Sequence, residues 1–145
     1  MISIRKATIE DRVILFNWVN KLDSLSVKME NENKILFHEH DKWFFERLKD
    51  KESFIWIILN EQKSPIGQVR FQKKIRKYFD VDIYLTASER KKGFAKKALY
   101  LAHKDSSFVS LRAVVKKNNK NSYNFFLNSC FNSECEVQSH WVLKK

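Results

Sequence analysis

Apolar and polar residues recur along the chain in two periods, which predict short strands and amphipathic helices. Residues 54–59 are continuously apolar, a pattern typical of a central strand that is buried on both faces. After residue 93, small and apolar residues recur with the spacing of one helix face, at Ala95, Ala98, Leu99 and Ala102. Together the patterns predict strands at 2–7, 54–59, 66–72, 79–85, 110–115 and 137–143, and helices at 8–20, 38–48, after 93 and at 122–128.

The expected order of elements is β-α-α-β-β-β-α-β-α-β, with a short extra strand near residues 134–137. Consecutive strands followed by alternating helices and strands predict an α/β fold, a mixed and mostly antiparallel central sheet with helices on both faces. Residues 21–33 show no clear period and predict a loop or a short helix, while a basic turn is expected at 73–78. Without linkers or repeats, the chain is expected to form one domain over residues 1–145.

The composition predicts a folded protein: the hydrophobic fraction is 43% and the aromatic fraction 14%. No run approaches the roughly 18 apolar residues of a membrane span, and the first residues enter a strand pattern rather than a signal peptide. We therefore expect a cytoplasmic protein with no membrane partner. Cys130 and Cys135 lack the spacing of metal ligands, so we expect reduced structural thiols and no metal site.

The formal net charge of +11 suits nucleic acid, an anionic membrane or a polyphosphate ligand. Because the lysines are spread along the whole chain, most of this charge indicates a solvated surface. The turn at residues 90–96 is different, since it joins a strand to a helix and combines lysines with Gly93, one of only 2 glycines. Main-chain N–H groups at a helix N-terminus attract anions. We therefore expect a phosphate-bearing cofactor at this turn.

Two motifs follow one another in the second half of the chain. The first is the turn Arg90-Lys91-Lys92-Gly93-Phe94-Ala95, and the second is Asn119-Lys120-Asn121-Ser122, followed by Phe126 and Cys130-Phe131. They resemble the (Arg/Gln)-x-x-Gly-x-(Gly/Ala) turn and the C-terminal strand-loop-helix of the GNAT acetyltransferase superfamily, and the resemblance covers nearly the whole chain. Two residues depart from the family pattern: Phe126 stands where many members have a tyrosine general acid, and Cys130 stands where glycine is usual.

The resemblance implies a GNAT-like fold and an N-acetyltransferase that uses acetyl-CoA as co-substrate and no metal. In this family the turn binds the pyrophosphate of coenzyme A. The strand before the turn pairs through its backbone with the pantetheine arm, and one of its N–H groups faces the oxyanion. Carried over to this chain, the expected cofactor contacts are Ile83, Tyr84, Leu85, Arg90, Lys91, Lys92, Gly93, Phe94, Ala95, Lys96, Asn119 and Ser122. For Asn119, a helix cap is an alternative that is compatible with this role.

Acetyl transfer to an amine requires a group that takes the proton of the amine and a way to protonate the leaving thiolate. Asp80 and Asp82 lie two residues apart on an expected strand and so share a face, which makes both candidate bases. His40 is a further candidate because imidazole titrates near neutral pH. Exposed strand acids and a surface histidine are the alternatives. For the acid, Tyr123 and then Tyr84 are candidates, and a thiolate also leaves without a side-chain acid.

A narrower resemblance concerns the acceptor. Residues 16–20, 40–44 and 67–71 are similar to segments of bacterial GNAT domains that accompany enzymes of pseudaminic- and legionaminic-type sugar biosynthesis. This resemblance implies that the acceptor is the 4-amine of a UDP-linked deoxysugar, although Val19 replaces an arginine of those domains. A guanidinium could pair with the nucleotide diphosphate. The expected acceptor contacts are Trp18, His40, Trp43, Gln68 and Arg70, and core packing is the alternative for both tryptophans.

Two other functions are compatible with the sequence. A GNAT enzyme could acetylate a protein terminus or lysine, but acceptor grooves for basic peptides are often acidic and this chain is basic. A non-enzymatic nucleic-acid-binding module would suit the net charge and the 12 phenylalanines, yet the aromatic residues follow apolar core patterns. We therefore expect a small-molecule amine acceptor, no nucleic-acid partner, and a monomer or homodimer.

Overall fold

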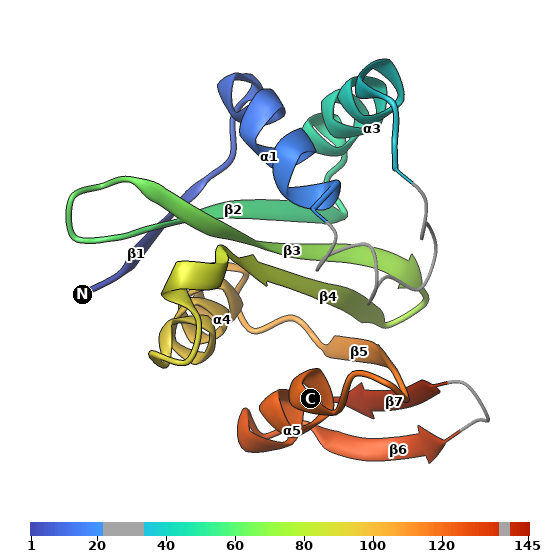
Figure 1. Cartoon of the computed structure of the whole chain (residues 1–145). Coiled ribbons are helices and arrows are strands. Elements are labelled where there is room, and N and C mark those ends of the chain that lie inside the picture. The colour runs from blue at the N-terminus through green and yellow to red at the C-terminus, as the bar shows by residue number, and fades with distance from the viewer. Residues whose placement is uncertain (22–33, 137–139) are drawn as a thin grey trace.

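The computed structural model describes residues 1–21, 34–136 and 140–145. Within these ranges a seven-stranded sheet has the order β1-β2-β3-β4-β5-β7-β6, with helices on both faces (Figure 1). Neighbouring strands are antiparallel, except that β4 and β5 are parallel. The strands are β1 Ser3–Lys6, β2 Ser53–Leu59, β3 Pro65–Ile75, β4 Tyr78–Leu85, β5 Leu111–Lys116, β6 Asn132–Glu136 and β7 His140–Lys144. The helices are α1 Arg12–Val19, α3 Phe37–Lys49, α4 Phe94–Asp105 and α5 Lys120–Asn128, with short 3-10 helices η1 Ile9–Asp11 and η2 Ala87–Glu89.

The order of the described elements confirms the mixed, mostly antiparallel α/β fold that the sequence predicts. The turn predicted at 73–78 is wrong in extent, because pairing of β3 with β4 continues through Lys73↔Phe79 and Ile75↔Tyr78. Exposed lysines do not prevent strand pairing, so a basic stretch is a poor signal for a turn. The strand predicted at 137–143 begins at His140 as β7, and the expected extra strand is β6. Residues 22–33 and 137–139 of these predictions lie outside the described residues.

The sheet separates two hydrophobic cores. Trp56 and Ile58 of β2 pack in the core that contains residues of α4 and α5. Ile55, Ile57 and Leu59 pack in the core that contains residues of α1 and α3. Figure 1 shows α1 and α3 above the sheet and α4 below it. All five of these β2 side chains are buried, which confirms the prediction of a strand covered on both faces. No helix in the described ranges is long and apolar enough to cross a membrane.

The ion pair between Arg5 and Asp11 connects β1 to the start of α1. Asp11 accepts two hydrogen bonds from the guanidinium of Arg5, each 2.8 Å long, and a third of 2.8 Å from the N–H of Thr8. Burial raises the pKa of Asp11, but these hydrogen bonds outweigh burial and hold the pKa below its ordinary value. The helix predicted at 8–20 therefore begins close to its predicted position, as η1 at Ile9, and continues as α1.

β3 and β4 lie unusually close together at Gly67. The two strands pair from Gly67↔Leu85 to Ile75↔Tyr78, over the whole length of β4. A Cβ atom on Gly67 would lie 2.1 Å from the carbonyl oxygen of Tyr84, so any side chain at this position would force the strands apart. The glycine therefore lets β3 hold β4 along its length.

Candidate active site

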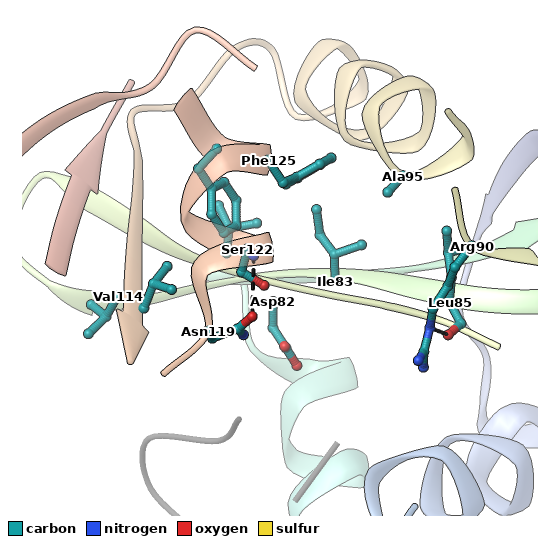
Figure 2. Close-up of a pocket in the computed structure, with 12 residues that line it drawn as sticks. Asp82, Ile83, Leu85, Arg90, Ala95, Val114, Asn119, Ser122 and Phe125 are labelled. Atoms are coloured by element: carbon teal, nitrogen blue, oxygen red, sulfur yellow. Dashed lines mark hydrogen bonds between the residues drawn. The ribbon is translucent and has the colours of Figure 1, made fainter. Parts of the chain in front are cut away.

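β4 and β5 are paired only near their beginnings. In the described part of the chain their ladder consists of Phe79↔Leu111 and Asp80↔Arg112, although both strands continue beyond these residues. A pocket of about 240 Å³ opens where they separate (Figure 2). We call it the β4–β5 cleft. Its lining comes from β4, β5, the turn before α4 and the start of that helix, and α5 with the residue that precedes it. It consists of Val81, Asp82, Ile83, Leu85, Arg90, Ala95, Val114, Val115, Asn119, Ser122, Phe125 and Phe126.

The backbone of β4 offers hydrogen-bonding groups to the cleft. The N–H of Phe79 donates to Ser110 of the β5 side at 2.8 Å, whereas the N–H of Thr86 donates to Ile66 of the β3 side at 2.9 Å. Because main-chain groups alternate in direction along a strand, the odd-numbered residues of β4 direct theirs toward β5 and the cleft. The parallel pair Asp80↔Arg112 uses the N–H of Val81, so the groups left for the cleft are the C=O of Val81 and the N–H and C=O of Ile83. One edge of β4 is therefore used by β3, and the other forms a wall of the cleft.

The turn from Arg90 to Ala95 leads from the end of β4 into α4, and both of these residues line the cleft. Gly93 precedes α4 with φ = 81°, a left-handed conformation that favours glycine. The guanidinium of Arg90 supports the turn, because its Nε donates to the carbonyl of Leu85 at 2.9 Å and its Cζ lies 5.4 Å from the ring centroid of Tyr84. The sequence prediction of a strand, a glycine turn and a helix is confirmed.

Lysines flank the N-terminus of α4. Lys91, Lys92 and Lys96 are exposed. Nζ of Lys92 lies 3.3 Å from Oε2 of Glu89. The first N–H groups of a helix have no partner within the helix, so this end combines free donors, the positive end of the helix dipole and lysine charge. Six of the predicted cofactor residues belong to this turn and its surroundings without lining the pocket: Tyr84, Lys91, Lys92, Gly93, Phe94 and Lys96.

β5 and α5 form the opposite wall of the cleft. Asn119 and Ser122 both line it, as the second motif predicts, and Oδ1 of Asn119 accepts a hydrogen bond of 3.2 Å from the N–H of Ser122. Asn119 thus caps α5 and also lines the cleft, so the helix cap is confirmed and the cofactor contact stays a prediction. The sequence analysis gave no site role to three lining residues, Val114, Val115 and Phe125. A signal for Phe125 exists, because it lies one helical turn after Ser122.

Cys130 forms the usual turn after α5 although it is not glycine. Its φ is 69°, in the left-handed region. The N–H of Phe131 donates to Phe126 at 3.0 Å and the N–H of Cys130 donates to Leu127 at 3.2 Å, which is the hydrogen-bond pattern of a Schellman helix end. The departure from the family pattern therefore leaves the turn intact, at a conformational cost to the cysteine.

The two candidate aspartates have different surroundings. Asp80 accepts two hydrogen bonds from Arg112, at 2.7 and 2.8 Å, and only 18% of its side chain is exposed. Asp82 lines the cleft, and 46% of its side chain is exposed. Its Oδ2 lies 3.3 Å from Nε2 of Gln68 and 3.4 Å from Nη2 of Arg70. The general base stays a prediction for both residues, and their geometry favours Asp82, because the oxygens of Asp80 are held by Arg112.

The two tyrosines considered as general acids lie outside the cleft lining. The ring of Tyr123 packs on Trp141, with centroids 4.1 Å apart. Tyr84 is on the other face of β4, with its ring centroid 5.8 Å from that of Trp18. Phe126 lines the cleft and has no proton to give. A side-chain acid therefore stays a prediction, and the cleft geometry favours departure of the thiolate without one.

Three of the predicted acceptor residues gather around Asp82. Gln68 and Arg70 contact its carboxylate, and the guanidinium of Arg70 lies 4.9 Å from the ring centroid of Trp43. Figure 2 shows the carboxylate of Asp82 directed to the side of the sheet where α3 lies, and Ile83 directed to the opposite side. Trp43, Gln68 and Arg70 thus form a polar and aromatic surface beside the cleft, in which Gln68 is buried, with 8% of it exposed.

The other two predicted acceptor residues are buried. Trp18 is 6% exposed and belongs to the core between the sheet and helices α1 and α3, in line with the core-packing alternative. His40 is 5% exposed, and its ring packs among those of Phe16, Trp43 and Phe44. The alternative of a surface histidine is therefore wrong. Burial also separates the imidazole from the cleft, which it does not line.

No group of three or more histidine, cysteine, aspartate or glutamate side chains is placed to bind a metal ion in the described ranges. A family model described as an acetyltransferase (GNAT) domain matches residues 2–129, which span the cleft and both motifs as far as α5. The chain belongs to the GNAT acetyltransferase family. It is an N-acetyltransferase, and its co-substrate is acetyl-CoA. No curated protein matches the chain.

Solved structures share the fold of this GNAT domain at low sequence identity. A domain from Methanocaldococcus jannaschii has 18% identity and a TM-score of 0.85 over 100% of this chain and 97% of that chain. The spermidine N-acetyltransferase from Vibrio cholerae in complex with CoA and spermine has 17% identity and a TM-score of 0.82 over 99% of this chain and 92% of that chain. A GNAT-family acetyltransferase from Streptococcus pneumoniae has 17% identity and a TM-score of 0.76 over 100% of this chain and 99% of that chain.

The β4–β5 cleft fits acetyl-CoA. The open edge of β4 offers donors and acceptors to the amide groups of a pantetheine arm. Val114, Phe125 and Phe126 make the opposite wall apolar, which suits the alkyl parts of that arm. The N-terminus of α4 beside its lysines suits the phosphates. The strand edge and apolar wall are followed by the N-terminus of α4, just as the pantetheine arm of acetyl-CoA is followed by its phosphates.

Proposed function

We propose that this GNAT enzyme transfers the acetyl group of acetyl-CoA to the primary amine of a small acceptor, which approaches from the face of the sheet that carries α1 and α3. The position of Asp82 carries the proposal. Asp82 lines the cleft, and its carboxylate contacts Gln68 and Arg70 of β3. Asp82 is thus the point where the cleft meets the surface formed by Trp43, Gln68 and Arg70.

Bound acetyl-CoA supplies an acetyl group that is activated as a thioester. The N–H of Ile83 faces it as a hydrogen-bond donor and, together with the C=O groups of Val81 and Ile83, holds it along β4. Asp82 binds the incoming ammonium and takes its proton on a carboxylate oxygen, for which the exposed half of the side chain leaves room. Phe125 and Phe126 exclude water from the other wall, which strengthens these polar interactions.

The acceptor that these surroundings suit best is a nucleotide-linked amino sugar. Arg70 lies beside Asp82, so an acceptor with an amine and an anionic group one sugar away could satisfy both residues. The ring of Trp43 offers an aromatic stacking surface, against which the guanidinium of Arg70 already packs. The two aspartates of this sheet face are each paired with an arginine, Asp80 with Arg112 and Asp82 with Arg70. Arginines on this face favour a ligand that is anionic in part.

A polyamine is the second candidate acceptor, because a structural neighbour from Vibrio cholerae is a spermidine N-acetyltransferase in complex with CoA and spermine. A polyamine carries several ammonium groups and is bound best by carboxylates without cationic partners. The pairing of Asp80 and Asp82 with arginines therefore favours the amino sugar over the polyamine.

Release of the coenzyme A thiol distinguishes the acceptors. The full chain is supplied with acetyl-CoA and, in separate reactions, a UDP-linked 4-amino deoxysugar, spermidine or a lysine-containing peptide. We expect kcat/KM for the amino sugar to exceed that for spermidine and that for the peptide by about 100-fold. This is the effect expected when an acceptor loses two charged contacts. A preference for spermidine or the peptide would replace the acceptor class and leave the acetyltransferase intact. Absence of acetyl-CoA binding in calorimetry would reject the donor site itself.

Asp82→Asn tests the proton transfer. The amide keeps the shape of the side chain but cannot take a proton, so we expect kcat to fall by about 100-fold, the lower end of the usual effect of a general base. KM for acetyl-CoA should change by less than about twofold, since the main chain of β4 is unaltered. Asp82→Glu, which keeps the carboxylate, should retain much more activity. Full activity of Asp82→Asn would show that another group, with Asp80 the next candidate, takes the proton.

A further inference from the structure

The ion pair between Asp80 and Arg112 lies at the point where β4 and β5 separate. The two residues are direct partners in the last pair of the ladder, and the pocket lining begins at the next residue, Val81. Both oxygens of Asp80 are engaged, at 2.7 Å from Nε and 2.8 Å from Nη2 of Arg112. The two side chains are 18% and 19% exposed, so the pair is screened less than a surface ion pair.

Each partner of this ion pair is fixed by a further strand. Asp80 stands opposite Gln72 in the ladder between β3 and β4, and Arg112 stands opposite Lys144 in the ladder between β5 and β7. Two side chains held in this way form a short and rigid connection. Beyond it, β4 has no partner among the described strands on its β5 side, so the ion pair lies at the end of the ladder that joins the two halves of the sheet.

We propose that the Asp80–Arg112 pair is a clamp that sets where the two strands separate and so fixes the shape of the acetyl-CoA cleft. Asp80 and Arg112 act on the donor through the backbone, and they are positioning residues. Without the clamp, the pairs Asp80↔Arg112 and Phe79↔Leu111 open more often, and the N–H groups of Val81 and Ile83 lose their fixed direction. Binding of acetyl-CoA must then order the strands, which weakens the affinity. This proposal rests on the proposed function, in which the β4–β5 cleft binds acetyl-CoA.

The test compares Asp80→Asn with Asp11→Asn. The second variant breaks the Arg5–Asp11 pair, which has the same two-bond geometry at 2.8 Å but joins β1 to the start of α1 and does not line the cleft. Arg112→Lys is a milder variant that keeps the charge and loses the two-bond geometry. Arg112→Lys takes the place of Asp80→Asn in the comparison if Asp80→Asn does not fold. The double variant Asp80→Arg with Arg112→Asp restores the pair in reverse.

We expect Asp80→Asn to raise KM and Kd for acetyl-CoA about tenfold, with kcat within about threefold of the wild type. Asp11→Asn should lower stability without changing KM, and the reversed pair should recover most of the lost affinity. Two outcomes overturn the clamp. Equal effects of Asp80→Asn and Asp11→Asn on KM would indicate a purely structural pair. A fall of about 100-fold in kcat at constant KM would indicate proton transfer by Asp80.

Amide hydrogen exchange tests the clamp without acetyl-CoA. The N–H of Phe79 donates to Ser110 at 2.8 Å, directly below the ion pair, and its exchange reports on opening of the strands. We expect Asp80→Asn to accelerate this exchange by about tenfold relative to the amides of β2, and Asp11→Asn to leave it unchanged. Unchanged exchange at Phe79 in Asp80→Asn overturns the clamp even if the donor binds elsewhere. Failure of the wild type to bind acetyl-CoA, with accelerated exchange in the variant, would reject the donor site alone.

Discussion

The two edges of β4 differ in what they bind. The edge toward β3 is paired from Tyr78 to Leu85, and at Gly67 the strands approach so closely that no side chain fits between them. The edge toward β5 is paired at Phe79 and Asp80 and then borders a cleft. One strand is thus rigid on one side because it is fully paired, and available on the other because its neighbour diverges.

This difference explains how a backbone can act as a binding site. Main-chain donors and acceptors in a folded protein are normally used by a neighbouring strand, and an unsupported strand would not hold them in place. β3 supplies the support, and the divergence of β5 leaves Val81 and Ile83 facing the cleft. Binding and support therefore use opposite edges of the same strand. The variants below test each edge, from the largest expected effect to the smallest.

Proline substitutions distinguish the edges most strongly. Tyr84→Pro removes an N–H that is directed to β3, and we expect a loss of about 3 kcal/mol or more in the free energy of unfolding. Ile83→Pro removes an N–H directed to the cleft, so the loss of stability should be clearly smaller, while acetyl-CoA affinity should fall by about tenfold or more. Urea denaturation and calorimetry measure the two effects. Equal destabilisation by both variants would contradict the assignment of the edges.

Gly67→Ala tests the closed edge alone. The added Cβ would lie 2.1 Å from the carbonyl oxygen of Tyr84, so the strands must shift, and we expect a cost of about 2 kcal/mol in stability. Since β4 would move with the shift, acetyl-CoA affinity should fall as well. Ser64→Ala, in the preceding exposed turn, is the control and should change neither quantity. A stable Gly67→Ala variant would show that the approach of the strands is looser than in the structure.

Cys130→Gly tests the support on the open side. Cys130 holds φ = 69° in the turn that ends α5, whose side chains form a wall of the cleft. Glycine adopts this conformation without the steric cost of a Cβ, so we expect a gain of about 0.5–1 kcal/mol in stability and unchanged acetyl-CoA affinity. Cys130→Ala keeps the Cβ and should show no gain, which separates the effect of conformation from loss of the thiol. Thermal denaturation under reducing conditions measures both.

Much of the fold follows from local patterns in the sequence. The continuous apolar run of β2 predicts burial on both faces, and the glycine turn before α4 predicts a helix N-terminus beside lysines. Both predictions depend on residues close to one another in the chain and both are confirmed. The second motif likewise places Asn119 and Ser122 in the cleft.

Other features of the site depend on contacts that local patterns do not contain. Asp80 and Asp82 look equivalent in the sequence, because both are acids on the same face of one strand. They differ because the parallel register of β5 places Arg112, 32 residues away, opposite Asp80, while β3 places Arg70 opposite Asp82. In the same way, Trp18 and Trp43 both suggest a binding surface, and only packing decides that Trp18 is in the core. Register and packing are set by the whole sheet, so these distinctions require the structure.

Amide hydrogen exchange along β4, with and without acetyl-CoA, is the most direct test of the account. The N–H of Ile83 faces the cleft, whereas those of Asp82 and Tyr84 face β3 and that of Val81 is used in the pair Asp80↔Arg112. We predict that saturating acetyl-CoA slows exchange at Ile83 by about tenfold or more and changes exchange at Val81, Asp82 and Tyr84 much less. Equal protection of all four amides by acetyl-CoA, or no added protection at Ile83, would contradict the claim that the open edge of β4 binds the donor.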